Sequence, residues 1–255
     1  MTPSLNWNIE GDGNALTSSN TPAKDFRLKG IPTTTDWPDF RGPGRRGIAP
    51  EQGIDLDWKP EPATLWRKPI GRGHASIIVI GNRYYTLEQQ GEFEVLICAS
   101  MLDGSPIWNF RRKERWNDSM GGLGPRSTPV YSKGKIFYLS SRGILTCIKA
   151  DSGKVSWEQA TLDPEYDFPH WGIACSPLIS GNMIIVSPGG ESGAVKSYDV
   201  ENGKLMWTAE LKGGGTYLSP SILNLIGEKF LVVAVEGKMC GLDPTTGMTL
   251  WEHPW

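Results

Sequence analysis

The sequence predicts an all-β fold, a β-propeller of four-stranded antiparallel blades in which about four blades are present and the ring is incomplete. A ten-residue unit that ends in tryptophan occurs four times, at residues 99–108, 148–157, 198–207 and 242–251. Neighbouring units are 44 to 50 residues apart, a spacing typical of repeat architectures. The chain also holds 31 glycines and 19 prolines among 255 residues, which suits a protein with many turns.

Each repeat opens with a Ser/Thr-Pro pair before a short apolar strand, in STPVYS, CSPLIS and LSPSIL, whereas HASIIVI carries Ile77 in place of the proline. A tight turn such as Gly81-Asn82 leads to the second strand, RYYTLE, KIFYLS, MIIVSP or KFLVVAV, because glycine supplies the positive φ that short hairpins need. The third strand follows in EVLICAS, GILTCIK, AVKSYDV or GKMCGLD, and the outer strand is expected to end at the tryptophan. Four short antiparallel strands in each period describe a propeller blade.

The turn before the outer strand is clearest in YDVENGKLMW. Asp199 and Gly203 are expected to shape this turn, and Trp207 to wedge between neighbouring blades. The position six residues before the glycine takes small side chains, namely Cys98, Cys147, Ser197 and Gly241. The unit therefore predicts architecture and not a chemical site.

The sequence contains more tryptophan-bearing outer strands than sets of the other three strands. Five outer strands are expected to end at Trp66, Trp108, Trp157, Trp207 and Trp251, but only four sets of the first three strands are present. We expect the strand around Trp66 to complete a further blade, which makes this chain an N-terminal portion of a larger ring. A closed four-bladed ring is the alternative, and it leaves Trp66 without a role.

The chain divides into three parts. Residues 1–36 are polar and are expected to form a weakly ordered lead-in. Residues 37–65 form a connecting segment with the motif WPDFRGP, and residues 66–255 form the partial propeller. The given chain shows neither the basic and apolar regions of a signal peptide nor an anchor, and it has no apolar run long enough to span a membrane as a helix.

Charge and cysteine spacing exclude some classes of function. Twenty-six basic residues against 28 acidic ones give a formal charge of -2, so no overall positive field favours an anionic membrane surface, and nucleic acid is not expected as a partner. The remaining cysteines, Cys175 and Cys240, are as isolated as Cys98 and Cys147, so no CxxC motif is present. A metal or haem site built on cysteine is therefore not expected.

The pattern D-x-x-[S/T]-G-K-x-x-W, nearest in YDVENGKLMW and LDPTTGMTLW, resembles the repeat of the pyrroloquinoline-quinone-like (PQQ-like) β-propellers of bacteria. That superfamily includes quinoprotein alcohol dehydrogenases and lipoproteins of outer-membrane assembly. The segment DWPDFRGPGRRG, residues 36–47, also resembles the opening motif of a branch of bacterial envelope propellers. The resemblance covers about residues 36–255 and implies a ring of seven or eight blades in the periplasm or cell envelope.

The resemblance leaves three functions open. A non-enzymatic binding protein or scaffold, with a protein or small-molecule partner at a propeller face or in the channel, needs no cofactor and no catalytic residue. A fragment of a PQQ-dependent alcohol or sugar dehydrogenase would hold PQQ with calcium, and such enzymes typically carry a vicinal disulfide that this chain lacks. A subunit of outer-membrane protein assembly is the third. We expect the first.

The candidate ligand contacts lie where the chain enters each first strand. Three residues before the opening proline, or before Ile77, the repeats carry His74, Arg126, Ala174 and Tyr217. His170 and Trp171, in FPHWGIACSP, precede the third of these strands. In a propeller these positions surround the channel, so they predict a ligand-binding rim. The alternative is an ordinary polar funnel around water.

Three other stretches have a chemical and a structural interpretation. Asp163, Glu165 and Asp167 alternate in DPEYD and offer oxygen ligands for calcium, although a solvated acidic loop is the alternative. The run RRKERW, residues 111–116, offers a basic surface for a phosphate or an acidic partner, or else a solvated loop. The glycine groups MGGLGPR, GGGTY and GRGHAS lack the lysine and helix of a phosphate loop and are expected to form sharp turns. Trp116 and Trp171, in loops, are the tryptophans open to a ligand role.

Overall fold

The computed structural model describes residues 36–49, 64–163, 169–191, 193–214 and 217–255. Nearly all of the expected lead-in therefore lies outside the described residues, as does part of the connecting segment. Within the described part, the secondary structure consists of eighteen strands and one 3-10 turn, η1 (Pro43–Arg45). It contains no helix of the length and apolarity that a membrane crossing requires.

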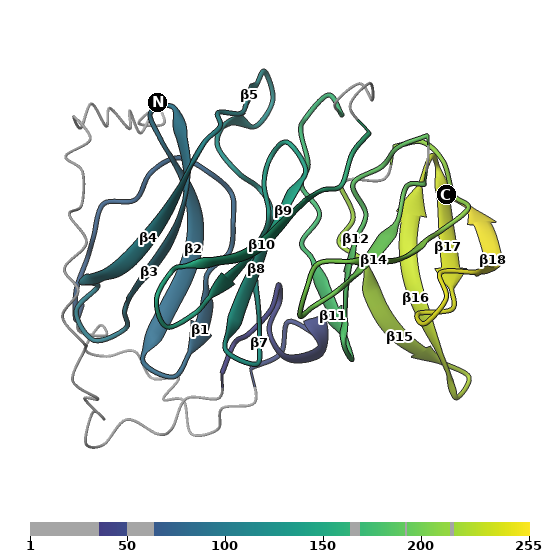
Figure 1. The fold of residues 1–255 in the computed structure, drawn as a ribbon, viewed down its shortest axis with the longest axis horizontal. Helices are drawn as coiled ribbons and strands as arrows, with labels where there is room; N and C mark the ends of the chain where they lie inside the picture. Colours follow the sequence, from purple (N-terminus) through teal and green to yellow (C-terminus); the bar gives the residue numbers. More distant parts are fainter. Residues whose placement is uncertain (1–35, 50–63, 164–168, 192, 215–216) are drawn as a thin grey trace, which may run out of the picture.

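Four separate antiparallel sheets of four strands follow one another along the chain, as Figure 1 shows. The first consists of β1 (Ile78–Ile80), β2 (Arg83–Gln90), β3 (Phe93–Ser100) and β4 (Pro106–Lys113). The second consists of β7 (Val130–Ser132), β8 (Lys135–Leu139), β9 (Ile144–Lys149) and β10 (Val155–Ala160). The third consists of β11 (Leu178–Ser180), β12 (Met183–Val186), β13 (Lys196–Asp199) and β14 (Leu205–Thr208). The fourth consists of β15 (Ser221–Leu225), β16 (Glu228–Val235), β17 (Lys238–Leu242) and β18 (Thr249–Pro254). These are blades 1 to 4, and the predicted all-β class of four-stranded blades is confirmed.

A small hairpin that the repeat does not predict lies between blades 1 and 2. It pairs β5 (Asn117–Asp118) with β6 (Gly122–Leu123). Because the strands of every blade alternate in direction, the loops into the first strands, the turns between second and third strands and the ends of the outer strands share one face. We call it the upper face, since the hairpin lies at the upper edge of Figure 1. The other turns lie on the lower face.

The outer strands do not end at their tryptophans, contrary to the sequence prediction. Trp108 is the third residue of β4, which continues to Lys113, and the corresponding tryptophans also lie near the start of β10, β14 and β18. A register shift just before each tryptophan places the tryptophan opposite a residue of the third strand. The outer strand then continues to pair with the third strand beyond the tryptophan. The residues opposite are the small ones noted above, Cys98, Cys147, Ser197 and Gly241. A Cβ on Gly241 would lie 2.0 Å from the ring of Trp251.

The tryptophans of blades 1 to 3 each cover the turn of the following blade. A Cβ on Gly153, Gly203 or Gly247 would lie within 2.8 Å of the ring of Trp108, Trp157 or Trp207 respectively. The indole nitrogens of Trp108 and Trp157 donate to the carbonyls of Ala150 and Val200, at 3.1 and 3.3 Å. The predicted wedge between blades is therefore present, and it requires glycine in the turn beneath it.

Trp66 occupies the same kind of position in front of blade 1. Its indole nitrogen donates to Met101 O at 2.9 Å, its ring stacks on Tyr84, and a Cβ on Gly104 would lie 3.0 Å from it. However, the described residues around it, 64–71, form no strand. Trp66 thus has a role that a closed four-bladed ring would not give it.

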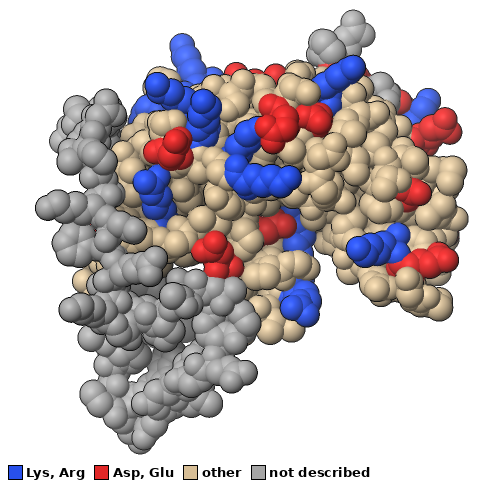
Figure 2. Space-filling view, turned by 60° about the horizontal axis from the view of Figure 1, so that its bottom comes forward, with Lys and Arg blue, Asp and Glu red and all other residues tan. Residues whose placement is uncertain are grey.

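The hydrophobic core is divided among the joints between blades. Three clusters of buried side chains lie between blades 1 and 2, between blades 2 and 3, and between blades 3 and 4. Phe137, Ile184 and Leu231 are fully buried in them. On the face in Figure 2, basic and acidic side chains are interspersed, in agreement with a formal charge of -2. The blades are thus held mainly by apolar contact with their neighbours.

Candidate functional site

The connecting segment crosses the innermost strands. Trp37 exchanges two backbone hydrogen bonds with Val79 of β1, at 2.8 and 2.9 Å, and Pro38 O accepts one from Tyr131 of β7 at 2.8 Å. Gly42, at φ 74°, lies against the ring of Trp37, where a Cβ would approach to 2.6 Å. The motif that carried the resemblance therefore ties blade 1 to blade 2 from the inside.

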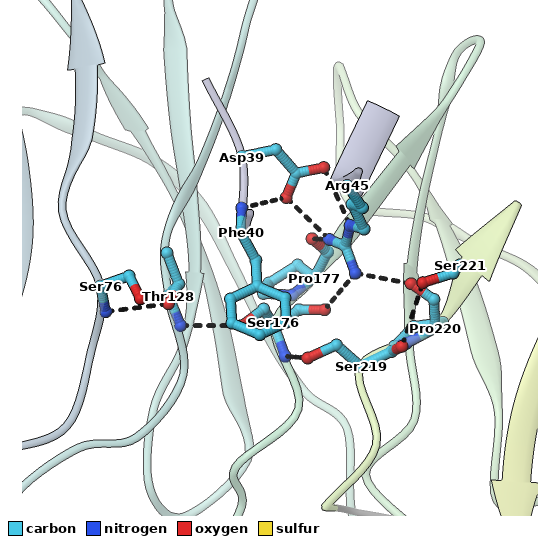
Figure 3. Close-up of polar contacts among 10 residues, drawn as sticks. All are labelled: Asp39, Phe40, Arg45, Ser76, Thr128, Ser176, Pro177, Ser219, Pro220 and Ser221. Carbon is cyan, nitrogen blue, oxygen red and sulfur yellow. Dashed lines mark hydrogen bonds and ion pairs between the residues drawn. The ribbon is translucent and has the colours of Figure 1, made fainter. Parts of the chain in front are cut away.

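Arg45 extends this tie to blades 3 and 4, as Figure 3 shows. Its guanidinium donates to Ser176 O at 3.3 Å, to Pro220 O at 2.6 Å and to Pro177 O. Two further bonds, both of 2.9 Å, reach the carboxylate of Asp39. All five N–H donors of the arginine are thus used, which is what a side chain only 4% exposed requires. Burial raises the pKa of Asp39, and the charge of Arg45 opposes that rise.

A row of hydroxyls joins the blades at the same level. The backbone nitrogen of Ser76 donates to Thr128 Oγ1 at 3.0 Å, that of Thr128 to Ser176 Oγ at 2.9 Å, and that of Ser176 to Ser219 Oγ at 2.9 Å (Figure 3). Each is the residue before the opening proline, or before Ile77. The Ser/Thr-Pro pair therefore contributes the joint as well as the strand start. Sequence reasoning missed this role, although four hydroxyls at equivalent positions were its signal.

A cavity of about 380 Å³ opens beside Arg45. Its lining combines the connecting segment with residues that precede the first strands, namely Phe40, Arg41, Arg45, Arg126, Ala174, Ser176, Tyr217, Leu218, Ser219 and Ser221. The predicted rim positions Arg126, Ala174 and Tyr217 are therefore brought together, and His74, His170 and Trp171 are not among the lining residues. Sequence reasoning did not include the connecting segment in this site.

Two of the predicted rim residues hold the β5–β6 hairpin. Arg126 pairs with the carboxylate of Asp118, which also accepts bonds from Gly121 N at 2.7 Å and Met120 N at 2.9 Å. These bonds, chiefly that from Gly121, lower the pKa of Asp118 to about 2. His74 Nε2 donates to Gly121 O at 2.8 Å. His74 and Arg126 thus have structural partners in the hairpin.

The other rim residues form an aromatic group between the loops of blades 3 and 4. The hydroxyl of Tyr217 accepts a bond from Trp171 N at 3.1 Å, and the two rings lie 5.1 Å apart. His170 meets Trp171 edge-on at 5.7 Å. Trp171 and Tyr217 are 36% and 49% exposed, so they remain accessible from the upper face.

The described residues do not assemble the oxygen ligands of a calcium site. Asp163 lies 3.8 Å from the ammonium group of Lys196, which supplies the positive charge that a cation would otherwise bring. Glu165 and Asp167 lie outside the described residues. Elsewhere in the described chain no three His, Cys, Asp or Glu side chains are grouped for a metal. The cavity beside Arg45 is lined by guanidinium and hydroxyl groups without a carboxylate, so it lacks the oxygen ligands that calcium prefers.

A buried acidic joint between blades 1 and 2 was also missed. Glu94 of β3 is 1% exposed, and its Oε2 accepts bonds from the nitrogen and hydroxyl of Ser141, at 3.1 and 2.6 Å. Glu114 accepts a bond of 2.6 Å from Arg142 N in the same turn of blade 2. Glu94 Oε1 and Gln89 Oε1, on residues paired across β2 and β3, have no partner. Burial, and next the charge of Glu114, raise the pKa of Glu94 to about 8.

Comparisons with known proteins agree on the fold and point to one family. A family model described as outer membrane protein assembly factor BamB matches residues 92–255. The outer membrane protein assembly factor BamB of Bordetella pertussis is 21% identical over 194 residues, which are 74% of this chain and 44% of that protein. The chain thus spans less than half the length of this curated relative.

Two solved structures extend the likeness beyond one family. Quinohemoprotein alcohol dehydrogenase ADHIIG from Pseudomonas putida HK5 matches with a TM-score of 0.66 at 18% identity, over 86% of this chain and 40% of that one. BamB from Moraxella catarrhalis matches with a TM-score of 0.58 at 13% identity, over 75% of this chain and 55% of that one. At such identities these two likenesses establish the fold alone.

Proposed function

The chain belongs to the family of outer membrane protein assembly factor BamB, and from this premise we propose that it is a non-enzymatic scaffold of the bacterial cell envelope that binds a protein partner of outer-membrane assembly. The contact set of Arg45 is the observation that carries the proposal. The connecting segment places this buried cation at the centre of the blades, where its donors are all used on the chain itself. A centre built in this way stiffens a platform whose upper face is left for contact.

The roles of the predicted rim residues support the same function. His74 and Arg126 hold a hairpin, and Tyr217 holds the backbone of Trp171. These side chains shape a surface and none is placed as an acid, a base or a nucleophile with a partner that activates it. A PQQ-dependent dehydrogenase is the second candidate, favoured by the fold shared with ADHIIG alone.

Co-purification tests the scaffold function directly. The tagged chain, exported to the periplasm of a Gram-negative host, is recovered from detergent extracts of the envelope, with an unrelated propeller as control. We expect the outer-membrane assembly machinery or its barrel substrates to be enriched over the control. Failure to enrich either, together with a saturable rise in melting temperature on adding PQQ with calcium and dye-coupled oxidation of alcohols, would establish the dehydrogenase instead.

A further inference from the structure

A groove of about 550 Å³ lies on the upper face and shares no lining residue with the cavity beside Arg45. Residues 113–117 form one side, where β4 ends and β5 begins, and Glu92 and Arg142 come from the turns that follow β2 and β8. The groove therefore spans blades 1 and 2. Its location coincides with the end of the basic run RRKERW.

The exposed charges of the groove are mostly positive. Lys113, Arg115 and Arg142 are exposed cations, whereas Glu92 is the exposed carboxylate among the lining residues. Arg115 lies 3.4 Å from Glu92, and both side chains are exposed to solvent, so this ion pair is weak. Within the described chain, Lys113 forms no ion pair. The ammonium group of Lys113 and the guanidinium of Arg115 thus remain available to an incoming anion.

The floor of the groove is rigid. The indole nitrogen of Trp116 donates to Asp118 at 3.1 Å, and the ring packs on Gly172, where a Cβ would approach to 2.6 Å. The guanidinium of Arg142 lies 5.9 Å above that ring. The backbone of Arg142 is fixed by Glu114, as described above. A guanidinium held over an aromatic ring loses little freedom when it binds a carboxylate.

We propose that this groove binds an acidic segment of a partner protein, with carboxylates of the segment on Lys113, Arg115 and Arg142. Arginine favours carboxylates because its planar guanidinium donates two parallel bonds to the two carboxylate oxygens. The volume suits a short stretch of chain. A flat anionic membrane is disfavoured, because the groove is concave, Glu92 stands at its edge and the whole chain is slightly acidic. The proposal rests on the proposed function in one respect, that the partner is a protein.

Direct binding of a peptide tests the groove without any assembly machinery. A short fluorescein-labelled Glu/Ser peptide is titrated with the purified chain and followed by fluorescence polarisation, next to a Lys/Ser peptide of equal length. We expect saturable binding of the acidic peptide alone, weakened by added salt. The double variant Lys113→Glu, Arg115→Glu should bind at least tenfold more weakly. The matched control Lys154→Glu, Lys204→Glu, on the lower face, makes the same change in charge and should bind as the unaltered chain does.

Three results would overturn the proposal. They are equal binding of both peptides, equal binding by the groove variant and the control variant, and binding to phosphatidylserine vesicles that the acidic peptide does not displace. Circular dichroism and melting of each variant establish that it is folded. If instead Arg115→Lys is used, a variant that keeps the charge but not the fork, an intermediate loss is expected. Co-purification and peptide binding are separate measurements. A failure of co-purification would leave the peptide result valid, and a failure of peptide binding would leave the co-purification result valid.

Discussion

Replacing Glu94 by glutamine should stabilise the protein at neutral pH and remove a pH dependence. The carboxyl pKa is 4.5 in an unfolded chain and about 8 in the fold, so between these values folding takes up a proton. The free energy of unfolding then falls by about 1.4 kcal/mol for each pH unit. The contribution of protonated Glu94 to the free energy of unfolding is fully present below pH 4.5 and is lost as the pH rises through about 8. Glutamine does not titrate, so the stability of the variant has no pH dependence from this position.

The magnitude follows from the two pKa values. At pH 7 the Glu94→Gln variant should be more stable by about 3 kcal/mol, whereas near pH 4.5 the two proteins should differ little. The amide also supplies an N–H donor opposite Gln89 Oε1, which now has no partner. Urea unfolding followed by tryptophan fluorescence, at a series of pH values from 4.5 to 8, measures the difference.

A matched control is available on the neighbouring turn. Glu92 is largely exposed and pairs weakly with Arg115, so Glu92→Gln should leave the free energy of unfolding nearly unchanged at every pH. If the difference between the unaltered chain and Glu94→Gln stayed constant across the pH series, Glu94 would not hold a proton in the fold and the reasoning would be refuted.

Three further substitutions test other joints. Arg45→Ala should lower the free energy of unfolding by about 3 kcal/mol or more, because it leaves Asp39 buried without its partner. Arg46→Ala, at the exposed neighbouring position, should change it little. Equal unfolding midpoints for the two variants would contradict the central role of Arg45. Gly181 has φ 64° and open space around a Cβ, so Gly181→Ala should lower the free energy of unfolding by about 1 kcal/mol. Gly203 has φ 74° and its Cβ would lie 2.7 Å from the ring of Trp157, so Gly203→Ala should lower it at least twice as much. Equal losses in thermal unfolding would mean that the wedge is not tight. Asp118→Asn should expose residues 117–123 to limited proteolysis while blades 1 to 4 stay protected, and an unchanged cleavage pattern would show that Asp118 does not organise the hairpin.

The blades could be predicted because their signals are local. A Ser/Thr-Pro pair, a turn and a tryptophan recur within 44 to 50 residues, and hydrophobic strands lie between them. The extent of the outer strands could not be predicted, since it depends on the length of the neighbouring third strand. The ladder from Cys98 to Phe93 carries β4 five residues beyond Trp108.

The centre of the site was less predictable because its contacts join distant residues. Arg45 reaches Ser176 and Pro220 across 131 and 175 positions, and no repeat marks it. The repeat predicts Arg126 and Tyr217 at one channel rim, and both line the cavity beside Arg45, but the repeat does not predict their hydrogen-bond partners. No sequence pattern marks Glu94 or Glu114, and only the packing of blade 2 on blade 1 makes them a buried pair.

The hydroxyl row has an evolutionary consequence. At every joint the backbone nitrogen comes from one blade and the oxygen from the next, so each blade is a donor on one side and an acceptor on the other. The tryptophan wedge has the same polarity. A complete blade inserted by duplication between two others could form these contacts with both neighbours. If a complete blade were deleted, the two blades on either side of it could form the same contacts with each other. Gene duplication and loss can therefore change the copy number of such units without a new interface having to evolve, provided that whole blades are gained or lost.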